Sequence, residues 1–223
     1  MHTRISGWAH GWLALSLMMS AGGADAAQTN FVAPPDQKVA GQTQAEWSAR
    51  WWQWASSFDA ARSPVADRTG KLCANGQQGD VWFLAGVYGS SPVKRECAVP
   101  AGKWLFFPIV NYVTYPPAPD AVGCESLIED VRAYTERPRD LTLIIDGVAV
   151  EDLTVHRQAT RDCFDLGARS GERIYPAAGN GYYVMLKPLP PGRHTIKWGG
   201  ILETLRQAVV YEITVAGDVA DTL

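Results

Sequence analysis

The stretch TQAEWSARWWQWASSF, residues 43–58, contains four of the nine tryptophans of the 223-residue chain. Thr43 and Glu46 are spaced as in a capping box, in which the threonine hydroxyl accepts from the amide of residue 46 and the glutamate accepts from the amide of residue 43. This pair predicts that a helix begins here. We expect the rest of the fold to form around that helix.

The tryptophans of this stretch do not all point in one direction. Trp47, Trp51, Trp54 and Phe58 recur at helical spacing, so a helix places them on one narrow apolar face. We expect that face to pack against a sheet as part of the core. Trp52 points about 120° away from its centre at 100° per residue. The ring of Trp52 is therefore a candidate for a second packing surface or for contact with a ligand or partner.

Residues 1–26 have the pattern of a secretory signal peptide. Arg4 precedes an apolar run over residues 12–19, and a cleavage site of the A-x-A type ends at Ala26. We therefore expect a secreted or periplasmic protein. No later stretch approaches the ~18 uninterrupted apolar residues of a membrane helix, so no integral membrane segment is expected after cleavage. The net charge of −3 argues against nucleic acid as a partner.

All four cysteines lie after the predicted cleavage site, and an even number in an oxidising compartment predicts two disulfides. Three pairings are open. We favour Cys73–Cys97, which brackets a predicted hairpin, and Cys124–Cys163, which ties the start of a predicted helix to a long loop. The cysteine spacing is unlike that of a zinc site, so no metal site is expected. A phosphate loop and a dinucleotide fingerprint are also missing from the sequence, so no cofactor is expected.

Several segments have the composition of β-strands. Two mainly apolar runs, 80–87 (DVWFLAGV) and 103–110 (KWLFFPIV), predict central strands buried on both faces. They are expected to pair across a loop that contains Cys97. The run LTLIIDGVAV, residues 141–150, predicts a hairpin with a type I′ turn at its Asp-Gly pair, residues 146–147.

The remaining segments predict further strands and one more helix. Residues 182–187 and 193–198 are expected to form a second hairpin with a proline-rich connection, and residues 207–215 a closing strand. Helical periodicity recurs over residues 124–135. Three prolines argue against regular structure over residues 112–123.

Together these elements predict a mainly β protein. The expected fold is an antiparallel β-sandwich or jelly roll with an N-terminal tryptophan-rich helix and a second short helix. We expect residues 27–42 to form a flexible N-terminal arm and residues 43–223 to form a single β-sandwich domain with helical additions. A chain of this length can bury one substantial core.

Three blocks of sequence are spread over most of the mature chain. The first is residues 47–57 with WWQW, the second is residues 73–86 with VWFLAG together with residues 97–111, and the third is residues 181–200 with PLPPGRHTI. In combination they resemble a family of uncharacterised secreted bacterial proteins. The resemblance implies a secreted protein and brings with it no known activity, substrate or catalytic residue.

Candidate catalytic groups are few. The sequence has no G-x-S-x-G motif, and no recognisable nucleophile accompanies the two histidines that follow the cleavage site, His156 and His194. His194 lies within a predicted strand, whereas His156 follows one and could reach Asp162 or Asp165. Carboxylate pairs have no distinguishing context. The sequence therefore favours a protein that is not an enzyme, and the catalytic residues stay unassigned.

Large aromatic residues are more abundant than a core of this size usually needs. The candidate ligand-binding rings are Trp52, Tyr182, Tyr183 and Trp198. Strand alternation predicts that one of the two adjacent tyrosines points inward and the other outward. Exposed rings favour a binding protein for a glycan or other extracellular polymer. The alternatives are an extracellular structural or assembly protein and a hydrolase that acts on such a polymer.

Overall fold

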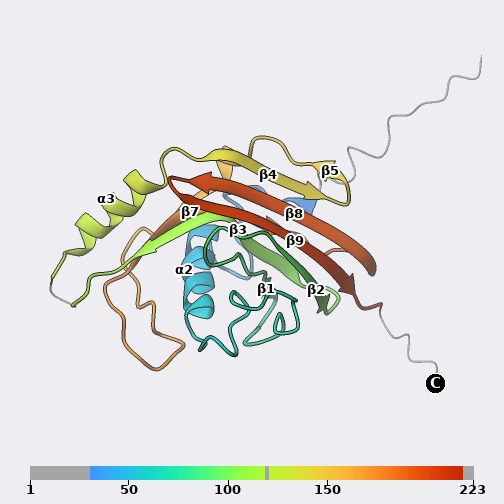
Figure 1. The fold of residues 1–223 in the computed structure, drawn as a ribbon, viewed down its shortest axis with the longest axis horizontal. Helices are drawn as coiled ribbons and strands as arrows, with labels where there is room; N and C mark the ends of the chain where they lie inside the picture. Colours follow the sequence, from blue (N-terminus) through green and yellow to red (C-terminus); the bar gives the residue numbers. More distant parts are fainter. Residues whose placement is uncertain (1–30, 119–120, 218–223) are drawn as a thin grey trace, which may run out of the picture.

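The computed structural model describes residues 31–118 and 121–217, so the predicted signal peptide, residues 1–26, lies outside the described residues. Two β-sheets pack face to face, and a tryptophan-rich helix covers the outer face of one of them (Figure 1). This architecture confirms the predicted mainly β sandwich with two helices. Within the described ranges, no helix is long and apolar enough to cross a membrane.

The two sheets have four and five strands in the described part of the chain. The first sheet has the order β1 (Val81–Phe83), β3 (Trp104–Thr114), β7 (Ala178–Leu186) and β6 (Arg157–Ala159). The second has the order β2 (Val93–Val99), β9 (Leu205–Val215), β8 (Gly192–Leu202), β4 (Arg139–Ile145) and β5 (Val148–Ala149). The helices are α2 (Gln44–Ala55), α3 (Cys124–Tyr134) and the 3-10 helix η2 (Leu153–His156).

Each sheet contains one parallel pair, and two predicted hairpins are wrong. β1 and β3 run parallel because the chain between them crosses to the second sheet and forms β2, the segment predicted as a loop around Cys97. β7 and β8 follow each other in sequence but belong to different sheets, so the prolines between them connect the two layers. β3 also continues to Thr114, within a segment predicted to be irregular. The hairpin of β4 and β5 is confirmed, with positive φ at both Asp146 and Gly147.

The described part of the predicted flexible arm is held against the first sheet. The amide of Ala33 donates to the Met185 carbonyl at 2.8 Å. Val39 is buried, and its carbonyl accepts a hydrogen bond from Nε1 of Trp47 at 3.0 Å. Residues 31–42 therefore belong to the folded domain, which moves its boundary toward the N-terminus.

α2 packs its tryptophan face on the outer side of the first sheet, as its periodicity predicts. Trp47, Trp51 and Trp54 are buried together with Phe83 and Phe106 of that sheet. Each of the three indole N–H groups also donates to a carbonyl outside the helix, at 2.9–3.0 Å, in Val39, Leu84 and Asn75 respectively. The aromatic face of α2 therefore combines burial of large rings with hydrogen bonds to the irregular segments around it.

β7 is buried along all nine of its residues because both of its faces are covered. The side chain of Tyr182 belongs to the core between the two sheets. The next residue, Tyr183, points to the opposite face, where its ring stacks on Phe106 beneath α2 with ring centroids 5.4 Å apart. The predicted alternation is therefore present, but the outward-facing ring meets a helix instead of solvent.

Both favoured disulfides are present in the structure. Cys73–Cys97 ties the turn-rich segment that follows α2 to β2, and Cys124–Cys163 ties the first residue of α3 to the loop after β6. Closure of such loops stabilises the fold mainly by restricting the unfolded chain. The two bonds therefore act on the parts of the chain that have the least regular structure.

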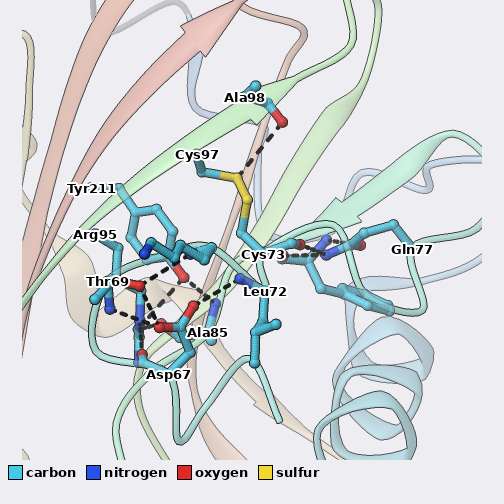
Figure 2. Close-up of a disulfide and its surroundings, with 12 residues drawn as sticks. Asp67, Thr69, Leu72, Cys73, Gln77, Ala85, Arg95, Cys97, Ala98 and Tyr211 are labelled. Atoms are coloured by element: carbon cyan, nitrogen blue, oxygen red, sulfur yellow. Dashed lines mark hydrogen bonds between the residues drawn. A yellow bond between two sulfur atoms is a disulfide. The ribbon is translucent and has the colours of Figure 1, made fainter. Parts of the chain in front are cut away.

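A fully buried arginine lies beside the first disulfide (Figure 2). Arg95 of β2 points inward, and its guanidinium lies 5.5 Å from the ring centroid of Tyr211 in β9. It donates hydrogen bonds of 2.7–3.0 Å to four backbone carbonyls, those of Val65, Asp67, Ala85 and Gly86. Since these carbonyls come from two irregular segments on either side of β1, Arg95 joins both segments to the second sheet.

The cap of α2 is the first testable feature. Thr43 Oγ1 accepts from the amide of Glu46 at 3.2 Å, and Glu46 Oε2 accepts from the Thr43 amide at 2.7 Å, which confirms the capping box. Thr43→Ala should lower the free energy of unfolding by about 1 kcal/mol in denaturant titration. Thr43→Ser keeps the hydroxyl and should stay close to wild type. Equal losses for the two variants would contradict the role of the cap.

Arg95→Met should have a larger effect. Several buried carbonyls would lose their donor, at about 1–3 kcal/mol each, so the free energy of unfolding should fall by more than about 3 kcal/mol. The matched control is Arg68→Met, because Arg68 is exposed and, within the described part of the chain, donates only to the Pro92 carbonyl. A loss for Arg95→Met no greater than for Arg68→Met, measured by denaturant titration, would show that the buried guanidinium is dispensable.

Candidate functional site

Three of the four predicted ligand-binding rings lie in the core. Tyr182, Tyr183 and Trp198 are 3%, 0% and 3% exposed. Trp198 of β8 lies between Phe107 and Tyr211, with ring centroids 4.5 and 5.4 Å away. None of these three candidate rings is therefore exposed for stacking on a ligand, since both faces of β7 and the inner face of β8 are covered.

Trp52 alone of the four lies at the edge of the core. Its half-buried ring meets that of Trp51 edge to face, with centroids 5.1 Å apart, and lies directly over Gly179 of β7. A Cβ atom at Gly179 would approach Cδ1 of Trp52 to 3.3 Å, which is tighter than ordinary van der Waals contact. Glycine at this position therefore allows the indole to rest on the strand.

A small cavity of about 80 Å³ opens beside Trp52. Its walls come from α2, from the segment after β1 and from the ends of β3 and β9, and include Trp51, Trp52, Val87, Tyr88, Asn111 and Gln207. The walls are mainly apolar, with two amide side chains among them. Ligand sites combine apolar walls with a few polar groups in this way, but at about 80 Å³ this cavity holds only part of a ligand, since whole-ligand pockets measure roughly 300–1,000 Å³.

One exposed tyrosine lines this cavity, and a second interacts with it electrostatically. Tyr88, which lines it, is 58% exposed, and Tyr115 is 51% exposed. The hydroxyl of Tyr88 lies 3.5 Å from the Ala55 carbonyl at the end of α2. Burial of this hydroxyl raises the pKa of Tyr88, and the nearby hydroxyl of Tyr115 adds to the increase. The Tyr88 hydroxyl is thus held against the protein while much of the side chain remains open to solvent.

The polar groups of the cavity are anchored from behind. Nδ2 of Asn111 donates to the hydroxyl of Tyr183 at 3.1 Å, and complete burial strongly raises the pKa of Tyr183, which keeps that hydroxyl neutral. The Gln207 amide makes two hydrogen bonds to the backbone of Val87, at 2.8 and 2.7 Å. These contacts position the residue that immediately precedes Tyr88. We call Trp52, Tyr88, Tyr115, Asn111 and Gln207 the aromatic cleft.

The sequence prediction named Trp52 as a candidate ligand-binding ring but did not name Tyr88 or Tyr115. The signal that was available is local: Tyr88 is followed by Gly-Ser-Ser-Pro, and Tyr115 by two prolines. Turn residues of this kind keep the chain at the surface, where a large ring has little core to join. Aromatic residues in turns are therefore better candidates for exposed rings than aromatic residues in apolar strands.

The two histidines in the described part of the chain, His156 and His194, have structural roles. Nδ1 of His194 lies 2.7 Å from Oδ2 of Asp146, and Nε2 lies 2.9 Å from the Pro190 carbonyl, so both ring nitrogens are engaged. The other oxygen of Asp146 accepts from the amide of Thr195 at 2.7 Å. This group ties the turn of the β4–β5 hairpin to β8. His156 is buried in η2, and burial lowers its pKa.

Comparison of the chain with protein-family models, curated proteins and solved structures finds no match. The site is therefore interpreted from its geometry. Among the described residues, no group of three or more His, Cys, Asp or Glu side chains is placed to hold a metal ion.

Burial of His156 predicts how stability depends on pH. A histidine whose pKa is lowered in the folded state takes up a proton first in the unfolded state, so the free energy of unfolding should fall as the pH drops below about 6.5. His156→Gln should reduce this fall between pH 7.5 and 5.5 in denaturant titrations. A variant with the same pH dependence as wild type would contradict the prediction, as would an imidazole NMR signal of His156 that titrates at 6.5 or above.

Proposed function

We propose that this protein is an exported binding protein that holds a glycan or a similar extracellular polymer in the aromatic cleft. The observation that carries the proposal is the exposed ring of Tyr88 in the wall of a cavity with amide side chains, together with the exposed ring of Tyr115, which interacts electrostatically with Tyr88. A sugar ring has an apolar face that stacks on tyrosine and hydroxyl groups that pair with amides.

The distribution of exposed rings supports binding over assembly. Among the described residues the exposed large hydrophobic side chains are Tyr88, Tyr115, Val155 and Tyr175, of which three are tyrosines. A surface built for stable protein contact is usually a wide apolar patch with a well-packed centre. A few amphipathic rings next to a small cavity suit a ligand better.

The edges of the two sheets also give little support to an assembly role. β1, β6 and β5 are edge strands of two or three residues, too short to template another chain. The longer edge strand, β2, directs Lys94 and Glu96 outward, and the amide of Glu96 donates to the Thr69 carbonyl at 2.9 Å. The open side of β2 is thus partly occupied by the protein's own chain.

A hydrolase is less well supported than a binding protein. Of the two histidines, His194 contacts a carboxylate, but its Nε2 faces the Pro190 carbonyl instead of a serine, threonine or cysteine side chain. Neither His194 nor Asp146 lines the aromatic cleft. A histidine whose two ring nitrogens are engaged by a carboxylate and a backbone carbonyl fits a structural role.

Export of the protein is part of the proposal. Two disulfides persist only where the environment is oxidising, which fits the periplasm or the cell exterior. The signal-peptide pattern of residues 1–26 and the resemblance to secreted bacterial proteins support the same compartment. Polysaccharides are common ligands of exported proteins, and the exposed rings of the aromatic cleft suit such a ligand.

A polysaccharide panel tests the proposed function. The mature protein should bind at least one soluble polysaccharide with a change in tryptophan fluorescence, since Trp52 lies in the cleft. Tyr88→Ala and Tyr115→Ala should each weaken binding by up to about tenfold, the effect of losing one stacking ring. Tyr175→Ala removes an exposed tyrosine that is outside the aromatic cleft and whose ring contacts the guanidinium of Arg173, and it should bind as wild type does. The absence of any binding, or equal binding by all three variants, would overturn the proposal.

A further inference from the structure

A second groove, of about 550 Å³, runs along a different side of α2. Trp47, Arg50 and Gln53 line it from the helix, and Gln78, Asp80 and Arg169 from the facing segments. The adjacent residues Trp52 and Gln53 diverge by about 100° around the helix, so the aromatic cleft and this groove open on separate sides of α2. We call it the arginine groove.

The two arginines of this groove have no acidic partner. None of the ion pairs between described residues includes Arg50 or Arg169. The guanidinium of Arg50 lies 5.4 Å from the ring centroid of Trp47, and no described group accepts a hydrogen bond from it. Nη2 of Arg169 donates to the Gly76 carbonyl at 2.6 Å, which holds the guanidinium in place. Both side chains are thus oriented while most of their N–H groups remain available.

The two positive charges also act on each other. Burial lowers the pKa of Arg169, and the charge of Arg50 lowers it further. Like charges brought together without an ion-pair partner are unfavourable, and an anion between them would relieve the repulsion. An arrangement of this kind is typical of an anion-binding site, where planar guanidinium groups pair with carboxylate oxygens.

The other residues that line the groove indicate what kind of molecule carries the anionic group. Asp80 reduces the positive charge, which favours a singly charged group over a densely charged one. The edges of Trp47 and Phe83 supply apolar surface, and Gln42 and Gln78 supply amides. Oε1 of Gln42 is buried without a hydrogen-bond partner among the described groups, so it calls for a donor such as a sugar hydroxyl or a water molecule.

We infer that the arginine groove binds the carboxylate of an acidic sugar residue, with Arg50 and Arg169 as its cationic partners. The inference rests on the proposed function in that the ligand is a glycan, and it narrows that ligand to a polymer containing uronate. The groove and the aromatic cleft use different residues, so each can fail without the other.

The test compares polymers that differ in charge. The mature protein is titrated with polygalacturonate and alginate, with a neutral polysaccharide of similar length and with dextran sulfate, at low and at physiological salt. The polyuronates should bind at least about tenfold more tightly than the neutral polymer, and added salt should weaken their binding. Arg50→Gln/Arg169→Gln should abolish this preference.

The matched control is Arg62→Gln/Arg132→Gln, which removes two exposed arginines that do not line the groove. It lowers the net charge equally and should keep the preference for polyuronates. Thermal melting curves of both double variants establish that they are folded. Loss of the preference in the control variant as well would show that only overall charge matters and would overturn the inference.

The other outcomes separate the two proposals. Binding of polyuronates that depends on Arg50 and Arg169, but not on Tyr88 or Tyr115, would support the arginine groove and overturn the aromatic cleft. Equal binding of neutral and acidic polymers, weakened by Tyr88→Ala only, would do the reverse. Binding of dextran sulfate as tight as that of polyuronates would overturn the assignment of a carboxylate ligand.

Discussion

The irregular segment between α2 and β2 depends on hydrogen bonds from the buried guanidinium of Arg95. Between α2 and β2 the chain contains only the three residues of β1 as regular structure, so most of its backbone groups have no strand or helix partner. Arg95 supplies donors to four of these carbonyls, and Cys73–Cys97 joins the same segment to β2 (Figure 2). Tyr88 lies in this segment, so the hydrogen bonds of Arg95 inside the core help to position the aromatic cleft.

Asp67 stabilises the same irregular segment. Burial disfavours the ionised form of its carboxylate, but hydrogen bonds from the amides of Leu72 and Thr69 outweigh burial and lower its pKa. The ionised side chain orders the turn whose Asp67 carbonyl accepts from Arg95 at 2.7 Å. The charge of this partly buried carboxylate is stabilised by the hydrogen bonds it accepts from Thr69 and Leu72.

Features that depend on neighbouring residues could be predicted from the sequence. Burial by segments that are distant in the sequence could not. The capping box of Thr43, the apolar face of α2 and the Asp146-Gly147 turn follow from local chemistry, and each is present. Alternation correctly sends Tyr182 and Tyr183 to opposite faces, but nothing in those residues reveals that α2 covers one face and the second sheet the other. The false hairpins have a similar cause, because a turn sequence shows that the chain changes direction without showing which sheet it enters.

Because both faces of β7 are buried, this strand can change less during evolution than the exposed segments of the chain. Every substitution in β7 meets a packed neighbour on one face or the other, so drift in this strand is limited to residues of similar volume. Tyr88 and Tyr115 project from segments outside that core, and Arg50 is exposed on α2. Related proteins could therefore exchange one ligand for another through a handful of surface replacements while the interior stays recognisable.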